Sequence, residues 1–369
     1  MKKSKNLVNI IKIANQFSTK GKVKGIQAWG SGNVNDTFLV TLDIPEENFI
    51  LQRINIKVFR QPKLVMQNLR ICTEYISQHL QSNHLKLERR WEVPKVQLTQ
   101  NSQDSYVDSE GNFWRGLSFI QGESFDTIKN TNLAQEVGYA LGRFHDFLSD
   151  LPTENLADTL PGFHITPLYL QQYEQVLEKV KIPASAEVKY GLRFISDRQK
   201  SINVLETAKQ QKKLPLRPIH GDPKVNNVIF DRTKQQAISI IDLDTVKPGL
   251  VHYDIGDCLR SGCNPSGEET QSWQEVRFEI DICQAILQGY FTLAKGFLND
   301  NDYEYIYEAI RLITFELGLR FFSDYLAGDI YFKAKYPEHN LARALVQFKL
   351  TESIESQADA IQSIIKDLK

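Results

Sequence analysis

The first 120 residues carry short runs of apolar and alternating side chains, separated by Gly, Pro and Asn at turn positions. Runs of this length and pattern favour strands. Two segments instead show helical spacing of their apolar residues, one beginning at Leu7 and one over residues 63–80. The pattern predicts a curled antiparallel sheet with helices attached. The expected strands are residues 25–29, 36–42, 49–54, 92–99, 106–108 and 113–120.

The remainder of the chain reads mainly as helices. The first of them should begin at an N-cap of Thr131 or Asn132 and stop before Pro152. We therefore predict an α+β protein with two lobes: a small strand-rich lobe over residues 1–120 and a larger helical lobe over residues 121–369, with a hinge near 118–122. The expected helices are residues 132–151, 168–181, 185–212, 268–295, 303–327 and 341–366.

One loop within the helical part concentrates polar chemistry, in the sequence Pro-Ile-His-Gly-Asp-Pro-Lys-Val-Asn-Asn of residues 218–227. A carboxylate, an amine and a carboxamide at this spacing suit phosphoryl transfer from a nucleotide. Asp222 would take the proton of an acceptor hydroxyl, and Lys224 would reach the moving phosphate as a point charge. Asn227 would offer an amide oxygen to Mg²⁺. His220 is better suited to bracing the loop than to acting as a base.

A second acidic cluster follows directly. Residues 228–231 and 237–241 read as a hairpin that returns Asp242 to the side of Asp222 and Asn227. Asp242 is then the expected main magnesium ligand. Asp244 could assist it, brace the loop or face outward. The two clusters together predict an ATP- and Mg²⁺-dependent kinase of a small molecule.

A kinase also needs a cover for the nucleotide phosphates. The turn of Gly30, Ser31, Gly32 and Asn33 lies between two expected strands, where glycines allow backbone N–H groups to approach phosphate oxygens. The turn lacks the Gly-Lys-Ser/Thr ending of a Walker loop, and a plain hairpin turn would look the same.

These motifs resemble the aminoglycoside phosphotransferase and choline kinase superfamily, which has a protein-kinase-like fold. The resemblance rests on His-Gly-Asp-Pro-Lys-Val-Asn-Asn and Ile-Ile-Asp-Leu-Asp and extends over nearly the whole chain. Within the superfamily the chain is most similar to the bacterial N-acetylhexosamine 1-kinases. The stretches that carry this finer likeness are residues 49–55 with 58–59, residues 241–249, and residues 318–326 with 328–329.

The resemblance implies further roles. Asp222 matches the catalytic base, and Asn227 and Asp242 match the magnesium ligands. Ser118 and Ile120 match hinge positions whose backbone C=O and N–H receive adenine. Asp254 matches an acid that braces the catalytic loop.

The resemblance fails at one position, because the superfamily usually has a lysine in the third strand and this chain has Gln52-Arg53 there. Arg53 could supply the charge if its side chain faces the nucleotide, with Glu74 as a candidate helix partner. An ordinary surface arginine is the alternative.

The finer likeness makes Arg320 and Asp324 candidates for holding sugar hydroxyls or an acetamido oxygen. They are four residues apart, so they share a helix face and could simply pair with each other. The expected acceptor is the anomeric hydroxyl of an N-acetylhexosamine. A choline-like, amino-alcohol or aminoglycoside acceptor is the first alternative, because residues 251–369 carry eight more acidic than basic side chains. A catalytically inactive binding module is the second.

Composition agrees with an ordinary globular enzyme, with 41% hydrophobic and 24% charged residues in 369. A net charge of −1 gives no global attraction to nucleic acid or anionic membranes. No apolar run is long enough to cross a bilayer, and the start lacks a signal-peptide cleavage pattern. The four cysteines fit no disulfide or zinc spacing. We expect a cytoplasmic protein and make no prediction of its oligomeric state.

Overall fold

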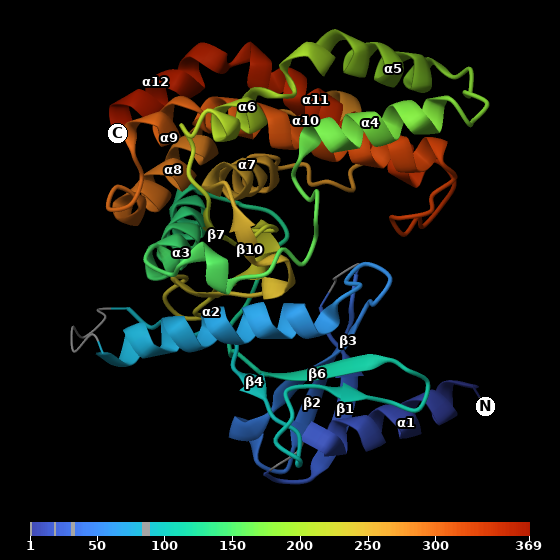
Figure 1. Ribbon diagram of the computed structural model, residues 1–369, viewed down its shortest axis with the longest axis vertical. Coiled ribbons are helices and arrows are strands. Elements are labelled where there is room, and N and C mark those ends of the chain that lie inside the picture. Colours follow the sequence, from blue (N-terminus) through green and yellow to red (C-terminus); the bar gives the residue numbers. More distant parts are fainter. Residues whose placement is uncertain (1, 18–19, 31–33, 83–88) are drawn as a thin grey trace. The chain divides into compact units, whose positions relative to one another are not determined.

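The computed structural model describes residues 2–17, 20–30, 34–82 and 89–369. The chain divides into two compact units. The first comprises residues 1–121 together with 155–160, and the second comprises residues 122–154 and 161–369. The first holds an antiparallel sheet and the second is mainly helical (Figure 1), so the predicted α+β class is confirmed.

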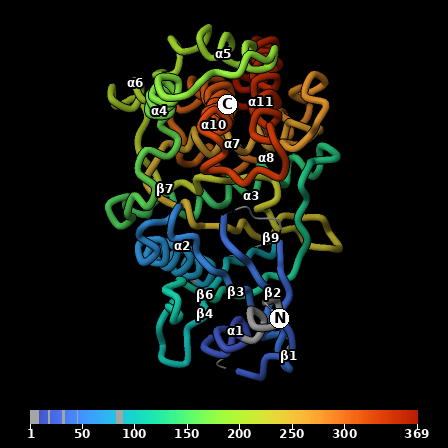
Figure 2. The backbone as a smooth tube through the Cα atoms, turned by 90° about the vertical axis from the view of Figure 1, so that its right-hand side faces the viewer, coloured from blue at the N-terminus to red at the C-terminus, as the bar shows by residue number. Residues whose placement is uncertain are grey.

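The first unit is built on a six-stranded sheet in the order β1-β2-β3-β6-β4, with β5 pairing to β6. Helices α1 and α2 lie on opposite sides of this sheet in both Figure 1 and Figure 2. The elements of the unit are α1 (Lys2–Phe17), β1 (Val23–Ala28), β2 (Asp36–Leu42), β3 (Phe49–Ile54), α2 (Pro62–Ser82), β4 (Val96–Gln97), β5 (Tyr106–Val107) and β6 (Phe113–Ser118).

Strict alternation gives this sheet two different faces. Phe49 and Leu51 of β3 belong to the apolar cluster that α1 covers with Ile13 and Phe17. Gln52 therefore points to the opposite face, while Arg53 shares the α1 face with the two buried residues. The alternation explains why the bounds predicted for β2 and β3 agree with the structure.

The second unit packs its helices around two short hairpin-like sheets, β7 with β10 and β8 with β9. The helices are α3 (Thr131–Leu148), α4 (Thr166–Leu177), α5 (Ala186–Arg198), α6 (Val204–Gln210), α7 (Val251–Gly262), α8 (Ile280–Ala294), α9 (Asp300–Glu304), α10 (Ile306–Leu326), α11 (His339–Ser356) and α12 (Ala358–Leu368). The strands are β7 (Arg217–Ile219), β8 (Val228–Phe230), β9 (Ala237–Ile240) and β10 (Lys247–Gly249). No helix among the described residues is long and apolar enough to cross a membrane.

Several predicted boundaries were wrong for local reasons. Helix α3 is capped by Asn130, whose side chain accepts from the Leu133 N–H, and not by Thr131 or Asn132. Helix α7 was not predicted at all. The helix expected from residue 268 begins only at Ile280, and the strand expected over 92–99 shrinks to β4. The single helix expected over 185–212 is broken into α5 and α6.

Two glycines set the distance between α3 and α8. A Cβ at Gly138 would lie 1.8 Å from the Ile286 carbonyl oxygen, and one at Gly289 would lie 1.9 Å from the Gln135 carbonyl oxygen. The two backbones therefore approach each other more closely than any side chain allows. Helix α3 also carries His145, which bonds to Asp254 behind the catalytic loop, so this contact helps to fix the position of that histidine.

Gly138→Ala should lower the free energy of unfolding by about 2–3 kcal/mol, because the added methyl group forces the two helices apart. Urea unfolding followed by circular dichroism measures this change. Gly296→Ala is the matched control, since the nearest atom that a Cβ there would meet, apart from its chain neighbours, is the Leu293 carbonyl oxygen at 3.6 Å. Equal stability of both variants would contradict the close-approach explanation.

Candidate active site

The residue before the expected base has a backbone that only glycine tolerates well. Gly221 follows β7 and has φ of +84°, in the left-handed region. A Cβ at this position would lie 2.7 Å from the Thr245 carbonyl oxygen. Antiparallel pairing of β7 with β10 brings these two segments together. The loop that carries Asp222 thus starts from a tightly constrained turn.

The side chain of Asp254, on α7, holds this turn by binding backbone N–H groups of the turn. Its carboxylate accepts the N–H of His220 at 2.6 Å and the N–H of Gly221 at 2.8 Å. His145 of α3 donates to the same carboxylate at 2.9 Å. Burial alone would raise the pKa of Asp254, but the hydrogen bonds from the His145 ring and the His220 N–H outweigh it, and the pKa is lowered. Asp254 therefore stays ionised as a brace.

His220 lies inside the loop and bonds to main-chain atoms on both sides of its ring. Nε2 lies 2.9 Å from the Ile241 carbonyl, to which it donates, and Nδ1 lies 3.2 Å from the Asp222 N–H, from which it accepts. These partners select the neutral ring, in agreement with a pKa that burial lowers. The geometry is that of a brace and leaves no ring nitrogen for proton transfer to a substrate.

Asp222, Lys224 and Asn227 come together as the spacing predicted. The Lys224 Nζ lies 3.0 Å from the Asp222 Oδ2, and the Asn227 Nδ2 donates to the Asp222 carbonyl at 2.7 Å. Burial raises the pKa of the Asp222 carboxyl despite the lysine beside it. The charge of Asp222 raises the pKa of Lys224, although burial acts in the other direction. A carboxylate made more basic in this way is suited to accept a proton.

The hairpin of β8 and β9 returns the chain to the same loop. The Ile241 N–H donates to the Asn227 carbonyl at 2.8 Å, so the next residue, Asp242, lies beside Asn227. Asp242 has φ of 66° and is exposed to solvent. Asp244 is buried, with 3% of its surface exposed, so an outward-facing Asp244 is excluded. Thr245 closes the arrangement by donating to the His220 carbonyl at 2.7 Å.

The expected nucleotide positions of the first unit are only partly described. Gly30 has φ of +74°, as a turn requires, whereas Ser31, Gly32 and Asn33 lie outside the described residues. Ser118 exchanges two hydrogen bonds with Lys95, giving its N–H to the Lys95 carbonyl and accepting the Lys95 N–H at its Oγ. The Ile120 N–H makes no hydrogen bond within the part of the chain that the structure describes.

Arg53 does not pair with Glu74, the candidate helix partner. It lies on the α1 face of the sheet, where its Nε donates to Asp36 at 2.8 Å and its guanidinium lies over Trp114. Glu74 instead pairs with Arg70 one turn away on α2. Arg53 pairs with Asp36 because strand register places the two residues directly opposite each other.

A different arginine occupies the other face of the sheet. Arg115 of β6 is almost fully buried and donates to the Gln52 Oε1 at 2.9 and 2.7 Å. Gln52 in turn donates to the Thr37 hydroxyl at 3.1 Å. The sequence signal for this cation was weak, because it depends on the register of β3 with β6 and not on any local motif.

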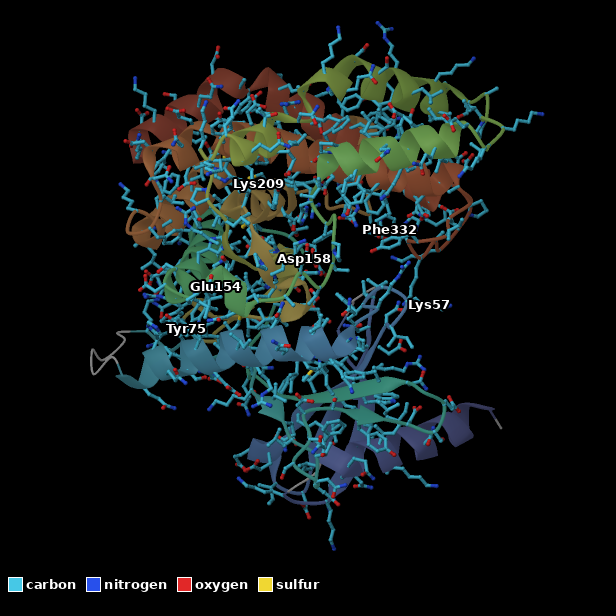
Figure 3. All side chains as sticks on the ribbon, in the orientation of Figure 1. Lys57, Tyr75, Glu154, Asp158, Lys209 and Phe332 are labelled. Atoms are coloured by element: carbon cyan, nitrogen blue, oxygen red, sulfur yellow. The ribbon has the colours of Figure 1, made fainter. Side chains whose placement is uncertain are left out.

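Arg320 and Asp324 share a helix but do not pair, so that alternative was wrong. Asp324 accepts the backbone N–H groups of Tyr331 at 2.7 Å and of Phe332 at 2.9 Å. Phe332, labelled in Figure 3, belongs to the connection between α10 and α11. Asp324 is therefore an anchor for this connection, whereas Arg320 is directed to aromatic rings.

Three rings surround the Arg320 guanidinium. Its Cζ lies 5.2 Å from the centroid of Phe163, 4.8 Å from that of Tyr169 and 5.5 Å from that of Phe332. Among the described residues it makes no hydrogen bond or ion pair. Phe163 adjoins His164, which bonds to the carbonyl of Gly221, the residue before Asp222. Burial alone would lower the pKa of Arg320, but the electrostatic effects of Tyr169, Glu316 and other acidic groups outweigh it, and the pKa is raised.

Three solved structures, all of kinases, have the same fold as the chain. An ethanolamine kinase from Plasmodium vivax is 15% identical, with a TM-score of 0.54 over 88% of this chain and 82% of that one. A microcompartment-associated aminopropanol kinase is 17% identical, with a TM-score of 0.63 over 95% and 98%. A choline kinase from Cryptosporidium parvum is 14% identical, with a TM-score of 0.58 over 97% and 98%. At these identities the likeness establishes the fold.

The family is established separately, from the sequence. The family model named APH, described as the phosphotransferase enzyme family, matches residues 25–282. This range includes the constrained turn at Gly221, the Asp222 loop and the hairpin that returns Asp242. Small-molecule kinase chemistry is thereby supported, and the chain belongs to the phosphotransferase enzyme family.

Proposed function

We propose that the protein transfers the γ-phosphate of ATP to a hydroxyl of a small molecule, with the anomeric hydroxyl of an N-acetylhexosamine as the acceptor. The observation that carries the proposal is the placement of Asp222 on a fixed turn, with Lys224 on its carboxylate and Asn227 and Asp242 beside it. Such a transfer needs positioning and electrostatic stabilisation more than covalent chemistry.

In this mechanism Asp222 orients the acceptor hydroxyl and takes its proton as the phosphate arrives. Lys224 neutralises negative charge that develops on the transferred group. The 3.0 Å ion pair keeps the Lys224 amine next to the Asp222 carboxylate, where the acceptor hydroxyl would bind. With about a third of each side chain exposed, both groups remain open to a substrate.

Asn227 and Asp242 would hold Mg²⁺. The Asn227 amide N–H is used by the Asp222 carbonyl, which leaves its oxygen for a cation. Asp242 adds an exposed carboxylate next to it. Two protein oxygens suit Mg²⁺, which takes its remaining ligands from phosphates and water. When bound, the ion would neutralise charge on the β- and γ-phosphates.

For the nucleotide we assign the Ser118 carbonyl and the Ile120 N–H to adenine and the turn from Gly30 to Asn33 to the phosphates. The available Ile120 N–H supports the first assignment. Arg53 is less suited to the phosphate role than its position in the sequence suggested, since Asp36 already neutralises it. Lys224 then carries more of the positive charge that the phosphates require.

The choice of a sugar over a cationic acceptor rests on the charge near the base. Arg320 offers a guanidinium surrounded by rings, which would repel a choline-like cation and bind hydroxyl or acetamido oxygens. Glu316, one turn away on α10, is hydrogen-bonded to His164 and Thr166. An amino-alcohol acceptor is the alternative, because the similar structures named above are kinases of ethanolamine, aminopropanol and choline.

Asp222→Asn should lower kcat by about 10²–10⁴-fold, the usual contribution of a general base, because the carboxamide cannot accept the proton. Binding of ATP, measured by calorimetry, should change little. Asp367→Asn makes the same chemical change at an exposed position of α12 and should retain full turnover. A fully active Asp222→Asn enzyme would refute the base assignment.

Asp242→Ala should weaken the dependence of turnover on Mg²⁺, with an apparent affinity lower by at least about tenfold, because a ligand oxygen is lost. A magnesium titration of initial rates at saturating ATP measures it. Asp231→Ala alters a carboxylate at the opposite end of the same hairpin and is the control. An unchanged titration curve for Asp242→Ala would remove this residue from the metal site.

An ATP-consumption screen should show turnover with N-acetylglucosamine or N-acetylgalactosamine and little with choline, ethanolamine or an aminoglycoside. Arg320→Lys keeps the charge and loses the planar fork, so the acceptor KM should rise by about tenfold while the KM for ATP is unchanged. Activity restricted to cationic acceptors would overturn the sugar proposal and leave the phosphotransferase assignment intact.

A further inference from the structure

A buried histidine outside the recognised motif contacts the catalytic loop. His164 precedes α4, has φ of 64° and is 4% exposed. Its Nε2 lies 2.8 Å from the Gly221 carbonyl oxygen, and its Nδ1 lies 3.0 Å from the Glu316 Oε1. Phe163 and Tyr253 pack against its ring. The residue therefore connects the turn before the base with α10.

Both atoms that face the ring are acceptors. A carbonyl oxygen and a carboxylate oxygen can each only receive a hydrogen bond, so both contacts require a proton on the ring nitrogen. A ring with two N–H groups is the charged imidazolium. Burial opposes that charge, but the hydrogen bond and charge of Glu316 outweigh it, and the pKa of His164 is raised. Thr166 also donates to the Glu316 Oε2 at 2.7 Å, which holds the carboxylate in place.

Gly221 is consequently held on both of its polar groups. Asp254 accepts its N–H at 2.8 Å, and His164 donates to its C=O at 2.8 Å. Each of these two residues has a further hydrogen-bond partner behind it. The Asp254 carboxylate bonds to the His145 ring, and the His164 ring bonds to the Glu316 carboxylate. The Gly221 carbonyl belongs to the peptide bond that joins this residue to Asp222, so its orientation sets the direction in which the Asp222 side chain leaves the backbone.

We propose that His164, as an imidazolium supported by Glu316, is a positioning residue for the base Asp222 in the phosphotransfer assigned above. It fixes the peptide plane between Gly221 and Asp222 and couples that plane to α10, the helix that carries Arg320. The catalytic consequence rests on the proposed function. The protonation of the ring rests on the two acceptor oxygens that face it.

Two substitutions separate the two contacts. The short amide introduced by His164→Asn can replace only Nδ1 and so keeps the Glu316 contact. The longer amide introduced by His164→Gln reaches the place of Nε2 and keeps the donor to the Gly221 carbonyl. The variant that loses the Gly221 contact should nevertheless be the more stable one, because asparagine tolerates the positive φ of this position better than glutamine does.

We expect His164→Asn to be the more stable variant and the less active one. Loss of the Gly221 contact should lower kcat by up to about 100-fold with the KM for ATP unchanged, since small misplacements of a reacting group are costly. His164→Gln should retain kcat within about tenfold of the original protein while melting at a lower temperature than His164→Asn. If kcat instead follows melting temperature across the two variants, the residue is merely structural and the proposal fails.

A second measurement does not depend on catalysis. Nitrogen-15 spectra of the histidines should show two protonated ring nitrogens for His164 at a pH above 6.5, the ordinary pKa of a histidine. In Glu316→Gln the ring should become neutral, because an amide replaces the charged acceptor. A neutral ring in the unsubstituted protein would overturn the proposal. Absence of turnover with every acceptor alongside an imidazolium signal would count against the proposed function instead.

Discussion

The positive φ of Gly221 is the constraint on which the rest of the site depends. At +84° the chain reverses direction immediately before Asp222, and the adjacent Thr245 backbone leaves no room for a side chain. A turn of this kind is not stable by itself, because glycine has more conformational freedom to lose than any other residue. Its stability comes from Asp254 on the N–H and His164 on the C=O.

Burial of the charges in these supports makes the loop rigid. Asp254 with His145 and Glu316 with His164 are all less than 5% exposed, and removal of either histidine would leave a buried carboxylate uncompensated. The pair of Asp222 and Lys224 differs, because about a third of each side chain is exposed. The site thus has fixed charges behind the loop and accessible charges in front of it, as positioning by a preorganised scaffold requires.

The sequence predicted best where short-range rules decide the structure. Strands β2 and β3 follow from alternation, and the spacing of Asp222, Asn227 and Asp242 follows from one loop and one hairpin. It failed where partners lie far apart in the chain. Arg53 pairs with Asp36 through strand register, and Asp324 binds the backbone of a connection beyond the end of its own helix. His164 has no motif, because its partners Gly221 and Glu316 are 57 and 152 residues away.

The residues that would carry out the reaction and those that would bind the acceptor differ in how far apart they lie in the chain. The reaction depends on a loop whose residues are close in sequence, and this is why a family model can match it. The acceptor side depends on how α10 meets the residues around Phe163, and small changes there alter the charge that a substrate meets. On this side of the base lie two cations, His164 and Arg320, and the carboxylate of Glu316 is bonded to the first of them. A protein with a carboxylate in place of either cation would present the opposite field on the same fold, so charge at these positions should divide neutral from cationic acceptors.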